Sequence, residues 1–208
     1  SDRIYLDKVM SACLDFVGGD YDLITFNGRH CMDRMYQRQP VLHGTTKIGS
    51  RRGTSSHQYN PMLILADHET TEDHGSCWSM TFMYSGSFQA EVERDQFNQT
   101  RALIGLQQEG FRYPLEPGDT FTAPEVILSF SADGLNRLSQ NLHVCIRDHV
   151  CRGKYKNAIR PILVNSWEGA YFDFNGETIY QLAVHAKDLG IDMVVMDDGW
   201  FGERDDDF

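Results

Sequence analysis

Basic residues are scarce in this sequence relative to acidic ones. The 208 residues include 19 Lys and Arg against 30 Asp and Glu, which gives a formal net charge of -11. Phosphate backbones and anionic lipid headgroups bind surfaces rich in cationic side chains, and an acidic protein repels them. The composition therefore argues against nucleic acid and against a membrane surface as the main partner.

Long apolar runs are also lacking. No stretch approaches the roughly 20 apolar residues of a membrane span, and no signal peptide is recognisable. The chain opens on Ser1 and passes directly into a strand-like pattern. We therefore expect the true N-terminus of the protein to lie upstream of this sequence.

Paired cysteines are absent as well. No C-x-x-C pair and no His/Cys cluster has the spacing of metal ligands, so we expect no metal and no cofactor. Free thiols in a reducing cytosol are favoured over a disulfide framework, which predicts a cytoplasmic protein. The five cysteines, an odd number, are scattered at Cys13, Cys31, Cys77, Cys145 and Cys151.

Short strands dominate the pattern from Ile4 to about Phe130. The hydrophobic content of 41% and charged content of 24% are those of an ordinary globular protein. Turns at Asn27-Gly28, Ser85-Gly86 and Pro117-Gly118 are expected to separate the strands. Many short strands with little helix predict an antiparallel sandwich. The clearest alternating or apolar runs are 21–26, 79–84, 88–93, 101–106 and 125–130.

The period changes to that of a helix from Asp133 to about Val150. Ser131 or Asp133 is the expected N-cap, and the apolar face is marked by residues spaced three or four apart. A polar segment follows, so we place a domain junction between about 150 and 160, with domains 1–150 and 151–208. The predicted helical face comprises Leu135, Leu138, Leu142, Ile146 and His149.

The stretch from Arg160 to Gly202 reads as strand, helix, strand. The apolar runs 161–164 and 193–196 are typical of strands buried on both faces. Between them, Asn175 is a plausible N-cap and Gly190 stands where a left-handed C-terminal residue is expected. Two strands joined by one helix predict a right-handed βαβ unit with parallel strands. The expected helical face comprises Ile179, Leu182, Ala183, Ala186 and Leu189.

Polar and aromatic residues follow both of these strands. The first strand runs into 165–168, which contains Trp167 and Glu168, and the second runs into 197–200, which contains Asp197, Asp198 and Trp200. Carboxyl ends of parallel strands form the ligand-binding rim of α/β sheets and barrels. Carboxylates accept hydrogen bonds from paired hydroxyls and indoles pack on pyranose faces, so a sugar would suit this rim. The alternative is that Asp-Asp-Gly only begins a turn.

Long motifs in this chain resemble the α-galactosidases of glycoside hydrolase family thirty-six. NSWE followed by YFDFN, a helix and then MDDGWFGERDDD carries most of the resemblance, which extends in order over nearly the whole chain. The upstream blocks are Tyr5-Leu6-Asp7-Lys8, Ser50-Arg51-Arg52-Gly53-Thr54-Ser55-Ser56-His57, Asn60-Pro61, Tyr84-Ser85-Gly86-Ser87-Phe88, Leu115-Glu116-Pro117-Gly118 and Thr122-Ala123-Pro124-Glu125.

The resemblance implies a fold and an activity. It predicts the later part of a β-supersandwich with its exit helix over 1–150, and the truncated start of a catalytic (β/α)8 TIM barrel over 151–208. The parent protein is expected to be a retaining α-galactosidase acting on raffinose- or melibiose-like galactosides. Both catalytic aspartates of the family lie on later barrel strands, beyond Phe208, so we expect this segment alone to be inactive. The family also implies a homo-oligomer, often a homotetramer, formed through the sandwich domain.

The resemblance also implies substrate-binding residues. Asp197 and Asp198 match the aspartate pair that holds galactose hydroxyls, and Trp167 matches a tryptophan near the pocket, with core packing as an equal alternative. His30 stands where family members often carry an aromatic residue that covers the sugar; an ordinary surface histidine is the alternative. Trp200 also follows the motif, although core packing is favoured for it.

Two polar clusters and two other functions remain as alternatives. The loop 51–57 is expected to be structural, since no nucleophile elbow or orienting acid accompanies its Ser and His residues. Asp205, Asp206 and Asp207 are expected to be solvated rather than to bind a cation. A raffinose-synthase-like galactosyltransferase, or a non-catalytic β-sandwich carbohydrate-binding module, would account for much of the same sequence.

Overall fold

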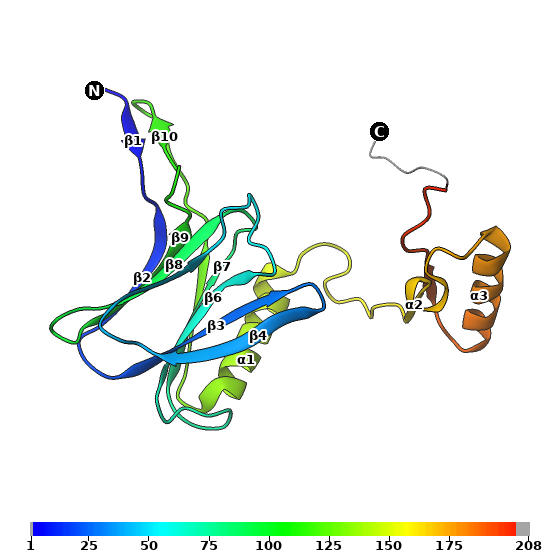
Figure 1. Ribbon diagram of the computed structural model, residues 1–208, viewed down its shortest axis with the longest axis horizontal. Helices are drawn as coiled ribbons and strands as arrows, with labels where there is room; N and C mark the ends of the chain where they lie inside the picture. Colours follow the sequence, from blue (N-terminus) through cyan, green and yellow to red (C-terminus); the bar gives the residue numbers. More distant parts are fainter. Residues whose placement is uncertain (1, 203–208) are drawn as a thin grey trace. The chain divides into compact units, whose positions relative to one another are not determined.

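A computed structural model describes residues 2–202 of the chain. The chain divides into two compact units, Ser1–Asp148 and His149–Phe208. The first unit is almost entirely β-structure, with one helix near its end (Figure 1). Its strands are β1 (Ile4–Leu6), β2 (Met10–Phe16), β3 (Tyr21–Arg29), β4 (Met32–Pro40), β5 (Gly44–Gly49), β6 (Tyr59–Asp67), β7 (Cys77–Phe82), β8 (Phe88–Arg94), β9 (Thr100–Leu106), β10 (Tyr113–Leu115) and β11 (Val126–Ser131).

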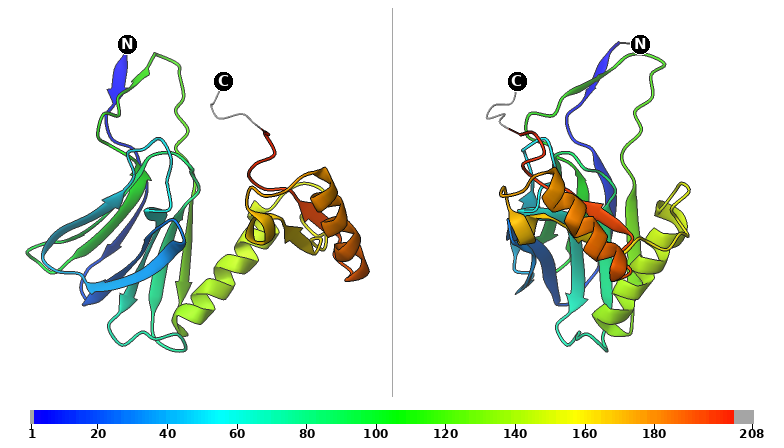
Figure 2. Two further views of the ribbon diagram at one scale, coloured as in Figure 1. Left: turned by 45° about the vertical axis from the view of Figure 1, so that its right-hand side comes forward. Right: turned by 90° about the vertical axis from the view of Figure 1, so that its right-hand side faces the viewer.

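Two antiparallel sheets form the body of the first unit. One has five strands in the order β11-β7-β6-β3-β4, and the other has four in the order β2-β9-β8-β5. The sheets face each other, and the short β1–β10 ribbon extends from one end of them (Figure 2). The predicted antiparallel sandwich is confirmed, with turns at Ser85-Gly86 and Pro117-Gly118 as expected.

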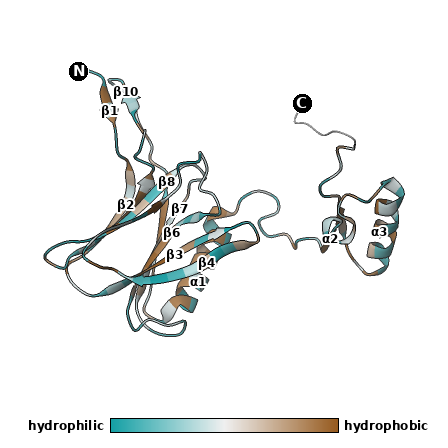
Figure 3. Ribbon diagram, viewed as in Figure 1, coloured by the Kyte–Doolittle hydropathy of each residue, from teal (hydrophilic) through white to brown (hydrophobic). Residues whose placement is uncertain are grey.

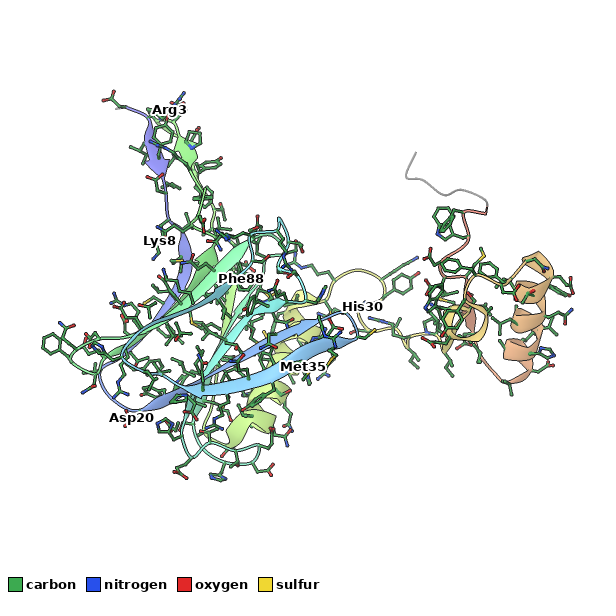
Figure 4. The ribbon with its side chains drawn as sticks, in the orientation of Figure 1. Arg3, Lys8, Asp20, His30, Met35 and Phe88 are labelled. Atoms are coloured by element: carbon green, nitrogen blue, oxygen red, sulfur yellow. The ribbon has the colours of Figure 1, made fainter. Side chains whose placement is uncertain are left out.

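The main core lies between the two sheets. Phe88 of β8 and Ile104 of β9 are fully buried, and they belong to the same cluster as Leu65 of β6 and Met80 of β7. Figure 4 shows Phe88 among the strands of the sandwich. Because each strand contributes every second side chain to this layer, alternation in the sequence is a sufficient signal for most of it.

The five-stranded sheet also buries its other face, against helix α1 (Gly134–Cys145). Leu138 of α1 packs with Ile24, Ile64 and Cys77 in a second cluster. β6 is therefore buried on both sides, which explains its continuous apolar run from Met62 to Ala66. Figure 3 shows the same contrast: the central strands carry much hydrophobic colour, whereas edge strand β4 is mainly hydrophilic.

The exit helix agrees with its prediction only in part. α1 begins after Asp133, but the Asp133 side chain makes no capping hydrogen bond, and its backbone N–H instead donates to Ser131 Oγ. Leu138 and Leu142 are buried as expected. The last turn widens into a π-helix, Ile146–Val150, which leaves Ile146 and His149 exposed rather than on the buried face.

The predicted turn at Asn27-Gly28 is wrong. Both residues lie inside β3, and the chain reverses two residues later at His30-Cys31. Gly28 opposes a bulge in β4 at which Arg34 adopts a φ of 54°. A Cβ at Gly28 would collide with the Met32 carbonyl. Glycine is needed here for close approach of two backbones, and not for a turn.

The buried carboxylate of Glu91 in β8 links the β1–β2 connection to β5. The Glu91 side chain is 10% exposed, and it accepts hydrogen bonds from Lys8 Nζ at 2.7 Å and Gln89 Nε2 at 3.0 Å. Lys47 Nζ lies 3.3 Å from Glu91 Oε2. Burial raises the pKa of Glu91, but the hydrogen bonds and charges of Lys8 and Lys47 outweigh burial and hold this pKa below its usual value.

The second unit is a single βαβ arrangement. Its elements are β12 (Leu163–Asn165), the short α2 (Trp167–Ala170), α3 (Gly176–Asp188) and β13 (Met193–Val195). β12 and β13 pair in parallel, as predicted. α3 begins at a capping box formed by Asn175 and Thr178, and Gly190 follows it with a φ of 78°. Both helix boundaries are therefore confirmed.

The burial expected in this unit is not found. Leu163 is 49% exposed and Met193 is 41% exposed, because two strands and one helix leave one face of the pair uncovered. Ala186 of α3 is buried, but Leu189 is 80% exposed. Within residues 2–202 the strand pair is therefore not buried on both faces, and Leu189 does not lie on the buried helical face. Burial of both strand faces stays a prediction for the longer protein.

Several other predictions can be checked against the described residues. All five cysteines are free. None of the helices within residues 2–202 is long and apolar enough to cross a membrane. The acidic run Asp205, Asp206 and Asp207 lies outside the described residues.

Candidate functional site

The predicted site residues of the second unit gather where its two strands end. Parallel pairing sets Asn165 of β12 opposite Val195 of β13, so both strands finish at the same edge. The Ser166 N–H extends the ladder by donating to the Val195 carbonyl at 3.0 Å. Residues that follow Asn165 and Val195 are thereby brought together, as expected of a strand-end rim.

Asp197 is a firmly held carboxylate. Its Oδ2 accepts a hydrogen bond from Asn165 Nδ2 at 2.6 Å, and its Oδ1 accepts one from the Asp198 backbone N–H at 2.8 Å. Its own backbone N–H donates to Ser166 Oγ at 3.1 Å. The residue is half-buried. Backbone and carboxylate are thus both fixed by the opposite strand end.

Asp198 is held more loosely. Its Oδ1 accepts a hydrogen bond from the backbone N–H of Gly199 at 3.2 Å, and the side chain is exposed. Gly199 has a φ of 95°, a conformation that favours glycine and that turns the chain sharply after the aspartate pair. The turn predicted from Asp-Asp-Gly is therefore present, and it leaves a carboxylate with free acceptor capacity at the rim.

Trp167 begins α2 beside these carboxylates. Its backbone N–H donates to Asn165 Oδ1 at 2.8 Å, and its half-buried ring meets the rings of Tyr171 and Phe172 edge-on at 5.1 and 5.0 Å. Tyr171 has a φ of 48°, which is rare for a bulky residue. An aromatic cluster of this kind offers apolar ring faces next to hydrogen-bond acceptors.

The sequence pattern alone does not indicate a role for two residues of the rim, Asn165 and Ser166. Ser166 is 2% exposed and links both strand ends, and Asn165 contacts both Asp197 and the start of α2. One signal could have indicated Asn165, namely its position as the last residue of β12. It pairs there with Val195, two residues before Asp197.

Trp200 and His30 are both exposed. Trp200 is 68% exposed within residues 2–202, and its core packing in the longer protein stays a prediction. His30 belongs to the first unit, where it is exposed at the end of the β3–β4 hairpin (Figure 4). A hollow of about 340 Å³ beside the tip of this hairpin is lined by Asn27, Gly28, Arg29, Met32, Met35, Gln58 and Tyr59, and not by His30.

The rim is suited to a neutral hydroxylated ligand. Its acceptors are carboxylate oxygens, its neighbours are aromatic rings, and the residues described from 2 to 202 contain no group of three or more His, Cys, Asp or Glu side chains that could hold a metal ion. Hydroxyl groups can donate to these acceptors while an apolar ring face packs on an aromatic side chain.

Comparison with known proteins assigns the chain to a family. The family model described as Glycosyl hydrolase family 36 N-terminal domain matches residues 1–116, and the model described as Melibiase matches residues 120–208. The chain belongs to glycosyl hydrolase family 36. The resemblance carried by NSWE and MDDGW is therefore confirmed.

Relatives within family 36 match the chain from end to end. It is 62% identical over 205 residues to the bifunctional alpha-galactosidase/sucrose kinase AgaSK of Mediterraneibacter gnavus, which covers 99% of this chain and 22% of that protein. It is 44% identical over 206 residues to alpha-galactosidase Mel36A of Lactobacillus acidophilus, covering 99% of this chain and 28% of that protein. The chain thus spans about a quarter of the length of these relatives.

A solved family 36 structure has the same fold. The alpha-galactosidase AgaA of Geobacillus stearothermophilus superposes with a TM-score of 0.94 at 43% identity, over 98% of this chain and 28% of that one. The fold class is confirmed: an antiparallel sandwich is followed by the first βαβ of the barrel of the melibiase domain. The division at 150/151 and the roles of Asp197, Asp198, Trp167 and His30 stay predictions.

Proposed function

We propose that the family 36 protein to which this chain belongs is a retaining α-galactosidase. It hydrolyses terminal non-reducing α-D-galactosyl residues of galacto-oligosaccharides such as raffinose and melibiose. In this proposal Asp197 and Asp198 bind the galactose hydroxyls, Trp167 packs near the sugar, and His30 reaches it from the sandwich domain. No cofactor is required.

The observation that carries the proposal is the aspartate pair at the shared strand end. Asp197 is fixed by Asn165 and Ser166, while Asp198 stays exposed with free acceptor positions. Relatives along the whole chain are alpha-galactosidases, and structures of AgaA variants from Geobacillus stearothermophilus contain stachyose or raffinose. These likenesses favour an α-galactoside over other hydroxylated ligands.

The chemistry of the pair accounts for selectivity between sugars. Galactose presents an axial hydroxyl beside its primary hydroxyl, and two neighbouring carboxylates can accept from both donors. A sugar with an equatorial group at that carbon leaves a partly desolvated carboxylate without a donor, at a cost of about 1–3 kcal/mol. We therefore expect galactosides to be preferred over glucosides by roughly one to two orders of magnitude through this contact alone.

The bond-breaking groups lie elsewhere in the protein under this proposal. In a retaining mechanism, one carboxylate attacks the anomeric carbon while a second, about 5 Å away, protonates the leaving oxygen and later activates water. Asp197 and Asp198 are adjacent in sequence and engaged with each other through the Asp198 N–H. They are assigned to binding, and residues 1–208 alone are expected to be inert.

The test is hydrolysis of 4-nitrophenyl α-galactoside by the whole protein, its Asp198→Asn variant and the isolated segment 1–208. We expect an active protein, a variant whose kcat/KM is reduced at least about tenfold, and an inactive segment. Asp192→Asn is a matched control on the same unit, since Asp192 accepts from the Ile162 N–H at the other end of the strand pair.

Each departure from this result identifies a different error. A whole protein that is active on another glycoside but silent on α-galactosides would sink the substrate assignment. Net transfer of galactose to an acceptor sugar in place of hydrolysis would point to a galactosyltransferase of the raffinose-synthase kind. Galactose binding by the isolated segment, without activity of the whole protein, would favour a carbohydrate-binding module.

The same proposal includes a homotetramer formed through the sandwich domain and a cytoplasmic location. Exposed apolar side chains on edge strand β4 support association, because Met32, Met35 and Tyr36 are 42%, 45% and 51% exposed. Free thiols, two of them exposed at Cys13 and Cys31, support a reducing compartment. Light scattering on the whole protein and cell fractionation test these two points separately.

A further inference from the structure

Asn165 connects the two halves of the rim through one side chain. Its Nδ2 donates to Asp197 Oδ2 at 2.6 Å, and its Oδ1 accepts from the Trp167 backbone N–H at 2.8 Å. The amide is therefore used at both ends, as a donor toward β13 and as an acceptor toward α2. Among the described residues, it is the only side chain that donates to the Asp197 carboxylate.

The consequence for Asp197 is a fixed carboxylate plane. An ionised carboxylate has about four lone-pair positions, and Asn165 and the Asp198 N–H occupy one on each oxygen. Ser166 holds the Asp197 backbone but not the rotation of the carboxylate, because its Oγ contacts the N–H. The direction of the remaining lone pairs thus depends on the amide of Asn165 together with the Asp198 N–H, and Asn165 is the side chain of the two.

We propose that Asn165 is a positioning residue that orients the Asp197 carboxylate for a sugar hydroxyl and ties the start of α2 to it. A carboxylate left free to rotate would have to be ordered when the sugar binds, which weakens binding. An amide is suited to this place because it supplies one donor and one acceptor without charge. This inference rests on the proposed function, since it assigns Asn165 a role in the same galactose site.

The isosteric substitution Asn165→Asp separates the two contacts. It keeps an acceptor for the Trp167 N–H but replaces the donor to Asp197 with a second carboxylate at the same distance, which repels the first. We expect kcat/KM of the whole protein for 4-nitrophenyl α-galactoside to fall about tenfold or more, mainly through KM. Gln181→Ala is the control, because it removes a side-chain hydrogen bond of 2.7 Å to Glu177 on the exposed face of α3.

The Asp197→Asn background distinguishes positioning from a general loss of structure. In that background an amide at 197 can donate to a carboxylate at 165, so the contact is restored with donor and acceptor exchanged. We expect Asn165→Asp to reduce kcat/KM less than about threefold there, against about tenfold in the unaltered protein. Equal effects in both backgrounds would overturn the proposal, because a merely structural residue acts independently of Asp197.

Other outcomes are equally decisive. If the Asn165→Asp protein fails to fold, as judged by its melting temperature, Asn165→Ala is measured in the same two backgrounds and the same non-additivity is expected. If the unaltered protein hydrolyses α-galactosides and Asn165→Asp and Asn165→Ala both match it within about twofold, only the positioning role is wrong. If the unaltered protein acts on no α-galactoside, the proposed function itself fails and the role of Asn165 fails with it.

Discussion

The two units of this chain differ in the contacts that stabilise each of them internally. The sandwich buries both faces of its five-stranded sheet. Leu65 and Met80 are removed from water on one side, in one cluster with Phe88 of the four-stranded sheet, and Ile24 and Cys77 are removed on the other side. In the βαβ unit, only Ser166 and Ala186 are buried among the described residues. Its order at the rim comes from a chain of short hydrogen bonds that starts at Asn165.

This difference separates stability from site geometry. A layered apolar core contributes most of the free energy of folding, and it does so without directional contacts. Under the proposed function, the rim requires specific angles between Asp197, Asp198 and Trp167, and directional hydrogen bonds are suited to set them. Substitutions in the two units should therefore differ in what they change: stability in the first, ligand geometry in the second.

The largest expected effect tests the core of the sandwich. Phe88→Ala should lower the free energy of unfolding by about 3–5 kcal/mol, because it leaves a cavity between the two sheets. Leu189→Ala in the βαβ unit should change it by less than about 0.5 kcal/mol, since Leu189 is 80% exposed. Denaturant unfolding of the segment 1–208, the chain to which these exposures apply, measures both, with hydrogen exchange to localise the change. Similar losses in the free energy of unfolding for the two variants would contradict the difference between the two units.

A smaller effect is expected at the Glu91 network. Glu91→Gln should cost about 1–3 kcal/mol near neutral pH, because Lys8 and Lys47 lose their carboxylate partner. Since folding lowers the pKa of Glu91, its contribution is present above the ordinary value of 4.5 and disappears as pH falls through the lower folded-state pKa. The difference between the two proteins should therefore vanish in acid.

Denaturation curves between neutral and acidic pH check this prediction. Glu93→Gln is the matched control on the same strand, because Glu93 is exposed. We expect it to change the free energy of unfolding by less than about 0.5 kcal/mol at every pH. A loss for Glu91→Gln that persists unchanged in acid would show that packing, and not the ionised carboxylate, is responsible.

The smallest effect compares the two helix starts. Asn175 caps α3 through its side chain, whereas the Asp133 side chain makes no capping bond to α1. Asn175→Ala should destabilise α3 by about 1 kcal/mol, and Asp133→Ala should have less effect on α1. Hydrogen exchange of the first-turn amides in each helix measures both. An equal or larger effect at Asp133 would contradict the assignment of caps.

The sequence alone predicts a feature correctly where that feature depends on residues close together in the chain. Asn175 as a cap, Gly190 as a left-handed residue and the parallel strand pair are all found as predicted. Alternation likewise predicts β8, and a short run predicts β9; inward residues of both strands belong to the main core. The aspartate pair could be placed at a strand end for the same reason, although its role in binding stays a prediction.

Sequence patterns do not predict a feature correctly where it depends on packing or pairing with a segment distant in the chain. Asn27-Gly28 has the composition of a turn, but pairing with β4 and β6 makes it part of a strand. The run 62–66 has no alternation, because α1 covers the second face of β6. The sequence does not indicate a role for Asn165, because its side chain contacts residue 197, and spacing along the chain does not reveal that contact.

The bulge opposite Gly28 has a consequence for how the hairpin can diverge between relatives. Pairing of β3 with β4 is regular up to Asn27 and resumes only at Arg29 and Met32, so the last pair is decoupled from the register of the sheet. The two residues at the tip, His30 and Cys31, can therefore be exchanged by evolution or by a combinatorial library without shifting any core side chain to the wrong face. Glycine or asparagine would be the most tolerated replacement for Cys31, whose φ is 61°. The tip can thus change while the paired strands keep their register, and Gly28 lies at the boundary between the two.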